Sequence, residues 1–161
     1  MTPSSALAFD LDTEQMIIES DLLGPLEVAA DELYRFPQGL FGFPDCHEFI
    51  LVGAERPGLY WLQSTEFPAL AFVTVDPFSY FDGYVLDLPT PDLRDLRVGS
   101  PDDVLVLAIV TLPGAHDEPP TANLQGPVAF NVRSRLAKQV VLENSPFGTR
   151  CPFELDHPQP A

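Results

Sequence analysis

Short apolar stretches, separated by turn residues, follow one another along most of the chain. The strongest is Val104–Leu112, and Ala69–Val75 has a similar β-branched, apolar composition before Asp76-Pro77 ends it. Stretches of this length and composition are typical of buried strands. The pattern predicts further strands at Met16–Ser20, Pro25–Val28, Asp31–Phe36, Phe49–Val52, Leu59–Ser64, Thr121–Leu124 and Val128–Val132.

Other segments give weaker or different signals. Tyr84–Leu88 is either a short strand or part of a longer connection, and Ala137–Glu143 is a strand candidate whose composition also allows a helix. Pro91–Val98 predicts a turn of helix, with Thr90 as its cap and Pro91 at the first helical position. The glycines and prolines of residues 37–44 predict a loop that is packed because it carries aromatic rings.

The turn signals recur at intervals of about 8–12 residues, which favours a small antiparallel β architecture. The length of 161 residues suggests one domain, and the 18 prolines limit helix length. We therefore expect a mainly β, antiparallel single domain with little helix, either a small barrel or a sandwich. Its predicted parts are a flexible acidic tail at residues 1–15, a β domain at 16–155 and a C-terminal tail at 156–161. The last ten residues should be mostly irregular.

Charge is strongly one-sided, with 24 acidic against eight basic residues and a net charge of −16. So few bases disfavour direct binding to nucleic acid or to an anionic membrane. Solubility is the simplest explanation of the charge; a sharper one is a protein that repels polyanions or docks on a basic partner. The first residues lack a basic, apolar leader, and the longest apolar run is too short to span a bilayer. We therefore expect a soluble, cytoplasmic protein.

Catalytic and metal-binding motifs are missing from the sequence. Asp45-Cys46-His47-Glu48 cannot converge on one ion from adjacent positions, so a polar turn is the better interpretation. His116 and His157 lie in predicted surface segments, and carboxylate pairs are expected by chance among 24 acids. We expect no metal, no cofactor and no enzyme, with the protein a monomer by itself. A hydrolase using some of the surplus carboxylates is the enzymatic alternative.

Aromatic residues crowd the stretch between Phe36 and Tyr84. Most of these rings should lie in the core, and burial is the better interpretation of any single one. The cluster Phe78-Ser79-Tyr80-Phe81, however, cannot bury every ring from one strand. Phe78, Tyr80 and Phe81 are therefore candidate partner-binding residues, because aromatic side chains are enriched in interface hot spots.

Six blocks of sequence, in their order and spacing, resemble one family. They are Phe36–Phe43, Trp61–Ser64, Ala71–Pro77, Ala108–Thr111, Thr121–Asn131 and Gln139–Leu142. Together they resemble the bacterial flagellar assembly factor family, FliW, from about Met16 to Phe153. The family loop usually reads Gly-Leu-Pro-Gly-Phe, and here Phe41 takes the place of the proline.

The resemblance implies a non-enzymatic, β-barrel-like binding protein with two partners. Members bind flagellin in the cytoplasm, and the chain-terminal helical segments of flagellin are the expected contact. Freed of flagellin, they bind the translational regulator CsrA away from its RNA site and relieve repression of flagellin messenger RNA. An acidic surface that repels RNA is part of that role, and Asp92, Asp95, Asp102 and Asp103 are candidates for it. The alternative function is a generic acidic β-barrel binding or chaperone module of another system.

The matching blocks also contain residues to which we assign structural roles. Gly39, Gly42 and Asn123 are expected to serve backbone geometry, and Pro127 belongs to the turn before Val128. Asn131, like Asn123, is expected to hydrogen-bond a neighbouring turn. Gln63 and Gln139 are polar within apolar segments, so each is either paired in the core or exposed for contact.

Overall fold

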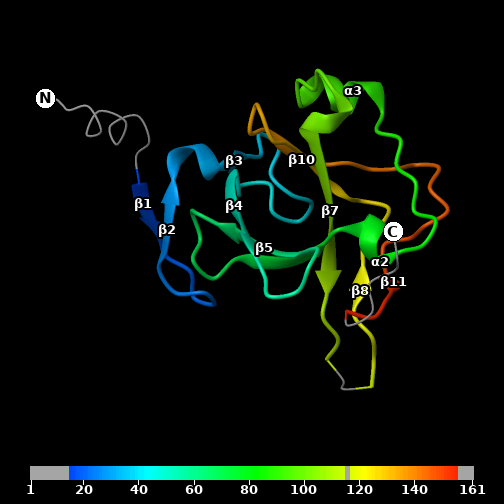
Figure 1. Cartoon of the computed structure of the whole chain (residues 1–161), viewed down its shortest axis with the longest axis horizontal. Coiled ribbons are helices and arrows are strands. Elements are labelled where there is room, and N and C mark those ends of the chain that lie inside the picture. The colour runs from blue at the N-terminus through cyan, green and yellow to red at the C-terminus, as the bar shows by residue number, and fades with distance from the viewer. Residues whose placement is uncertain (1–14, 115–116, 156–161) are drawn as a thin grey trace, which may run out of the picture.

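In the part of the chain that the structure describes, residues 15–114 and 117–155, short strands form two sheets (Figure 1). The structure is a computed structural model, and every strand pair in its two sheets is antiparallel. The smaller sheet contains β1 (Gln15–Ile18) and β2 (Leu26–Ala29). The larger sheet contains β3 (Tyr34–Arg35), β4 (Glu48–Gly53), β5 (Leu59–Ser64), β6 (Ala71–Val75), β7 (Val104–Thr111), β8 (Thr121–Ala122), β9 (Val128–Asn131), β10 (Ala137–Gln139) and β11 (Cys151–Pro152).

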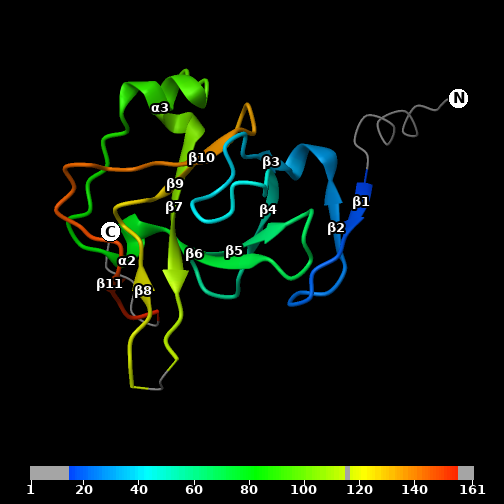
Figure 2. The same ribbon diagram turned by 180° about the vertical axis from the view of Figure 1, so that it is seen from behind.

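Strand β7 organises the larger sheet, whose order is β10-β9-β7-β6-β5-β4-β3. Along one edge β7 pairs with β6, where Val110 faces Val73. Its other edge is shared, because Val104 faces Asn131 of β9 while Val110 faces Ala122 of β8. Strand β11 extends the sheet beyond β8. Figure 2 shows β7 running between the helix α3 (Thr90–Asp95) at one end and the β8–β11 pair at the other.

A seam connects the two edge strands of this path. A single parallel bridge joins Arg35 to Leu136, and the Arg35 N–H donates to the carbonyl of Arg135 at 2.8 Å. The Arg135 guanidinium lies 3.8 Å from the ring centroid of Tyr34 and donates to the carbonyl of Glu32 at 2.8 Å. The sheet is therefore barrel-like without closing into a barrel. The predicted mainly β, antiparallel fold with little helix is confirmed.

The main core lies on one face of the larger sheet. Its aromatic rings meet edge to face. The ring centroid of Phe36 lies 5.0 Å from that of Phe49 and 5.8 Å from that of Phe130. Such aromatic pairs are worth about 0.5–1.5 kcal/mol beyond the area they bury. The smaller sheet packs against β4 through Ile18 and Val28, which contact Ile50. Of the twelve aromatic residues between Phe36 and Tyr84, four are buried, four are half-buried and four are exposed, so less of the aromatic surplus lies in the core than expected.

Short helical segments fill the connections between strands. They are η1 (Ala30–Glu32), α2 (Pro77–Tyr80), α3 and η2 (Pro101–Asp103). The sequence predicted Asp76-Pro77 only as the end of a strand, whereas Asp76 also caps α2. The predicted cap of α3 is wrong by one residue, because the carbonyl of Pro89 accepts the first helical hydrogen bonds and Thr90 lies inside the helix. None of the described helices is long and apolar enough to cross a membrane.

Of the last ten residues, which were expected to be mostly irregular, the structure describes residues 152–155. Pro152 belongs to β11, and residues 153–155 lie in no helix or strand, although Phe153 is buried against Tyr80. Only Ala137–Gln139 of the segment 137–143 is strand, and the side chain of Gln139 bonds the loops on either side. Tyr84–Leu88 is an irregular connection rather than a strand. The predicted tails lie outside the described residues, apart from Gln15, which begins β1.

Candidate partner-binding site

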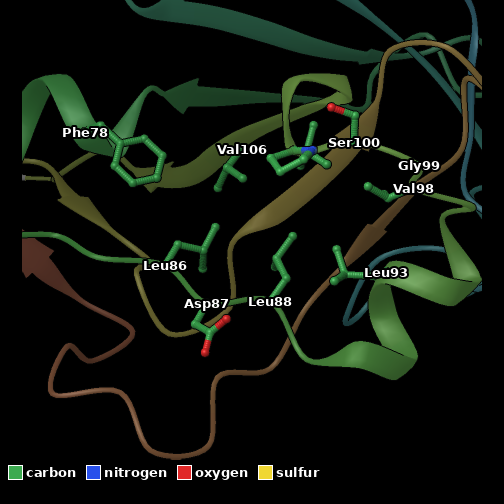
Figure 3. Close-up of a pocket in the computed structure, with 11 residues that line it drawn as sticks. Phe78, Leu86, Asp87, Leu88, Leu93, Val98, Gly99, Ser100 and Val106 are labelled. Atoms are coloured by element: carbon green, nitrogen blue, oxygen red, sulfur yellow. The ribbon is translucent and has the colours of Figure 1, made fainter.

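An apolar groove lies between β7, α3 and the irregular segment 84–89 (Figure 3), with a volume of about 580 Å³. Val104 and Val106 both line it from β7, because alternate strand residues share one face. Figure 3 shows Leu86, Leu88 and Leu93 pointing into the same space. Hollows of this size and apolar lining are typical of binding sites.

Phe78 stands at one end of the groove because of how α2 begins. The Asp76 carboxylate accepts the Phe78 N–H at 3.0 Å, and Pro77 occupies the first turn. This short helix turns Tyr80 into the core and leaves Phe78 48% exposed. The Phe78 ring leans on Tyr84, with 5.4 Å between the centroids. The groove therefore offers one large aromatic face to a partner.

The irregular wall of the groove is fixed by Tyr84. Its hydroxyl donates to the carbonyl of Leu124 at 2.9 Å, and its ring packs edge to face on Phe147 with 5.2 Å between centroids. Asp87, on the same wall, is the acidic residue among those that line the groove. The wall is thus held in place without helix or strand hydrogen bonds of its own.

The opposite wall, α3, is attached to β10 by Lys138. The Lys138 Nζ lies 2.6 Å from Asp92 Oδ1 and 3.0 Å from Asp95 Oδ2. Burial lowers the pKa of Lys138, but its hydrogen bonds to the two carboxylates outweigh this and raise the pKa overall. The ammonium of Lys138 therefore stays charged, and Asp92 and Asp95, two of the candidate acids, share this one cation.

Asn131 holds the C-terminal end of α3 from β9. Its Nδ2 donates to the carbonyls of Leu96 at 2.8 Å and Arg97 at 3.2 Å. Its Oδ1 accepts the N–H groups of Arg133 at 2.9 Å and Ser134 at 3.1 Å. The side chain is 2% exposed, so it is structural, as expected.

The four candidate acids are not brought together as one free carboxylate cluster. Asp92 and Asp95 share Lys138, while Asp102 and Asp103 lie in η2 before β7. Asp103 lies 3.9 Å from Arg133, and Asp102 is exposed. An RNA-repelling surface made by these four residues would therefore act with one of the two charges of Asp92 and Asp95 offset by Lys138.

The three candidate aromatic residues differ in how far their rings are exposed. Tyr80 is buried and donates its hydroxyl to the carbonyl of Pro57 at 3.0 Å. Phe81 is half-buried against Phe153, with 5.3 Å between ring centroids. Of these three, Phe78 presents the exposed ring.

The two glutamines whose role the sequence left open are both paired. Gln63 is fully buried; its Oε1 accepts the Ser20 hydroxyl at 2.6 Å, and its Nε2 donates to the carbonyl of Ser64 at 2.9 Å. Gln139 Oε1 accepts the Phe41 N–H at 3.0 Å, while its Nε2 donates to the carbonyl of Gly126 at 2.9 Å. Both side chains tie a loop to the sheet rather than face a partner.

The remaining motif residues shape the backbone. Gly39 and Gly42 have positive φ values of 68° and 86°, and a Cβ on Gly39 would lie 2.5 Å from the carbonyl oxygen of Phe43. Asn123 Oδ1 accepts the Gly126 N–H at 2.8 Å, and the carbonyl of buried Pro127 accepts the N–H of Val140. These residues hold loops and turns, as the sequence indicated.

No group of three or more metal-binding side chains occurs among residues 15–114 and 117–155. In the sequence Asp45-Cys46-His47-Glu48, His47 Nδ1 lies 2.9 Å from the carbonyl of Phe36. Burial raises the pKa of the Cys46 thiol, and Glu66 and Asp45 add to the rise. Cys46 and Cys151 are both free. His116 and His157 lie outside the described residues.

Sequence reasoning missed most of the groove. The alternation of Val104 and Val106 gave a usable signal for one face of β7. Leu86 and Leu88 gave none, because their segment has no regular structure and its position depends on Tyr84. Asp87 was likewise missed, since the sequence does not show which of the many acids lie beside apolar residues.

Tyr84 gives the wall a measurable pH dependence. Burial, with a smaller contribution from Cys151, raises the pKa of Tyr84 from 10.0 to about 12. The folded state therefore holds this proton more tightly than the unfolded state. The resulting stability is complete below pH 10 and is lost as the pH rises toward 12. We expect Tyr84→Phe to cost about 1 kcal/mol at pH 8, since the Leu124 carbonyl loses its partner.

Urea unfolding at pH 8, 10 and 11 checks this prediction, together with ultraviolet titration of the tyrosines. Between pH 10 and 11 the Tyr84→Phe variant should lose less stability than the wild type. Equal losses in the two proteins would contradict the assignment.

Comparison with known proteins gives a consistent result. Residues 17–153 match the family model described as FliW protein. The flagellar assembly factor FliW of Moorella thermoacetica is 39% identical over 136 residues, which cover 84% of this chain and 86% of that protein. The flagellar assembly factor FliW of Natranaerobius thermophilus is 37% identical over 142 residues, covering 88% and 94%.

A solved structure agrees with these matches. The crystal structure of the flagellar assembly factor FliW superposes with a TM-score of 0.78 at 36% sequence identity. The match covers 85% of this chain and 96% of that chain.

Proposed function

Because this chain belongs to the FliW family of flagellar assembly factors, we propose that it binds flagellin and, when free, binds and antagonises the translational regulator CsrA. Antagonism of CsrA relieves repression of flagellin messenger RNA, so flagellin itself reports whether more flagellin is needed. Both steps precede export, which places the protein in the cytoplasm. The role is one of binding rather than catalysis, and the net charge of −16 favours a monomer between partners.

The groove is the observation that carries the flagellin part of the proposal. The ends of a flagellin chain are apolar before assembly, and a groove lined by leucines and valines suits such segments. Its two walls are fixed by Tyr84 and Lys138, so little conformational entropy is lost on binding. Phe78, exposed at one end, would serve as the aromatic anchor.

The charge supports the CsrA part. Like charges repel only within about 8 Å at physiological salt, so the acids must lie close to the RNA path. Asp102 is exposed in η2, and Asp87 lies on the groove. Asp92 and Asp95 share the cation of Lys138, which offsets one of their two charges, whereas Asp102 is exposed; replacing either of the paired aspartates by Asn should therefore alter RNA release less than replacing Asp102.

The test uses purified flagellin, CsrA and a flagellin leader RNA. We expect the protein to bind full-length flagellin, to lose binding when flagellin lacks its terminal segments, and to release RNA from CsrA when flagellin is absent. Phe78→Ala should weaken flagellin binding by about tenfold, as removal of an anchor of 1–2 kcal/mol predicts.

Leu112→Ala is the control, because Leu112 is 55% exposed and is not among the residues that line the groove, whereas Phe78 is 48% exposed. Undiminished binding of truncated flagellin would refute the terminal-segment contact. If neither flagellin nor CsrA bound, the alternative of an acidic binding or chaperone module of another system would be favoured.

A further inference from the structure

A second apolar surface lies away from the groove, where residues 41–46 meet residues 65–70. It contains a hollow of about 420 Å³ whose lining includes Phe43, Pro44, Asp45, Cys46, Phe67 and Leu70. Phe43 is 39% exposed and Phe67 is 47% exposed. We call this the Phe43–Phe67 surface. Exposed aromatic rings around one hollow mark an interaction site more often than isolated exposed residues do.

The loops that present these rings are fixed by hydrogen bonds. Phe43 and Leu40 exchange two backbone hydrogen bonds, of 2.8 and 3.1 Å, and one side of the Phe43 ring rests on Phe72. Phe67 donates its N–H to the Ser64 hydroxyl at 2.9 Å and accepts the Leu70 N–H at 3.0 Å. The rings are therefore held in place before any partner arrives, which lowers the entropic cost of binding.

The charge around this surface is acidic. Asp45 lines the hollow, whose lining includes no lysine or arginine. Glu66 directly precedes Phe67, and the Asp21 N–H donates to the carbonyl of Pro68 at 2.9 Å, which places Asp21 beside the same loop. An apolar hollow with acidic neighbours is complementary to apolar side chains flanked by cations.

Two possible occupants are disfavoured by this charge. A second copy of the chain, docked through the same surface, would place Asp45 and Glu66 against their own counterparts. Residues 1–14 of the chain carry three acids and no base, so they would also be repelled. An anionic membrane is disfavoured for the same reason.

We propose that the Phe43–Phe67 surface binds an apolar protein segment that carries lysine or arginine beside its apolar side chains. The lining of the groove also has one aspartate, Asp87, and no lysine or arginine, but α3 beside it carries Arg94, and Lys138 offsets one of the two charges of Asp92 and Asp95. The inference stands on this surface alone and does not depend on the proposed binding of flagellin or CsrA.

The test uses two synthetic 18-residue helical peptides with the same leucine pattern, one with lysine and the other with glutamate at the polar positions. Binding to the full chain is measured by fluorescence anisotropy at physiological salt. We expect the Leu–Lys peptide to bind at least tenfold more tightly than the Leu–Glu peptide. Phe67→Ala should weaken the Leu–Lys peptide at least fivefold, and Phe78→Ala less than twofold.

The pair of phenylalanine variants separates a specific surface from general attraction of a cationic peptide to an acidic protein. Ala69→Lys, at an exposed residue that lines the hollow, adds a long side chain and a repelling positive charge there and should also block binding of the Leu–Lys peptide. It keeps the test decisive should Phe67→Ala fail to fold. Equal effects of Phe67→Ala and Phe78→Ala, full binding by Ala69→Lys, or equal affinity for both peptides would overturn the proposal.

Discussion

Replacing Gly39 by alanine is expected to lower the free energy of unfolding by about 3–5 kcal/mol, a large part of the stability of a typical domain. The new Cβ would lie 2.5 Å from the Phe43 carbonyl oxygen and 2.7 Å from the backbone of Pro44. These are backbone atoms and cannot rotate away. The positive φ of 68° adds strain for any residue with a side chain.

Gly42→Ala is the matched control for this prediction. Gly42 lies in the same loop with φ at 86°, but a Cβ there would meet no atom within 4 Å. Gly42→Ala should lower the free energy of unfolding by only about 1 kcal/mol, which is the strain of a residue with a side chain at a positive φ. Urea unfolding of both variants measures the difference. A similar loss in the two would show that the close approach at Gly39 relaxes at little cost.

Asn131→Leu is expected to lower the free energy of unfolding by about 3–4 kcal/mol. The leucine would remove four hydrogen bonds and leave the Leu96 and Arg97 carbonyls without this donor. A partner left unpaired on burial costs about 1–3 kcal/mol. Because Asn131 holds the end of α3, the same change should also loosen the groove wall and weaken flagellin binding.

Asn131→Asp distinguishes the hydrogen bonds that the Asn131 side chain donates to the end of α3 from those that it accepts. It keeps an acceptor for the Arg133 and Ser134 N–H groups but loses the donor toward α3. Asn144→Leu, at an exposed position, should change stability by less than about 0.5 kcal/mol. Thermal unfolding and flagellin affinity, measured on the same samples, check both effects. Full flagellin affinity in Asn131→Asp would contradict the coupling between Asn131 and the groove.

Strands with a clear apolar pattern were predicted well from the sequence. Leu59–Ser64 matches β5, and Val104–Leu112 exceeds β7 by one residue. Both strands lie inside the sheet, where burial imposes a composition that the chain itself displays. The start of α2 was missed although its signal was present, because an aspartate followed by proline both ends a strand and begins a helix.

The binding surfaces could not be predicted in the same way, because they depend on contacts between distant residues. The groove requires Tyr84 to reach Leu124 and Lys138 to reach Asp92. Gln63 illustrates the limit, since its Oε1 accepts from Ser20, 43 positions away in the chain. A polar residue within an apolar stretch has the same appearance in the sequence whether it is paired or exposed.

The seam at Arg35 also determines how late in synthesis the larger sheet can be completed. Arg135 reaches the Leu33 carbonyl across 102 positions, so the outer edge of β3 has no partner there until most of the chain has left the ribosome. Pairings between such distant segments close slowly. An unpaired strand edge meanwhile invites association with other nascent chains. Completion of this fold is therefore an event at the end of synthesis rather than a stepwise process during it.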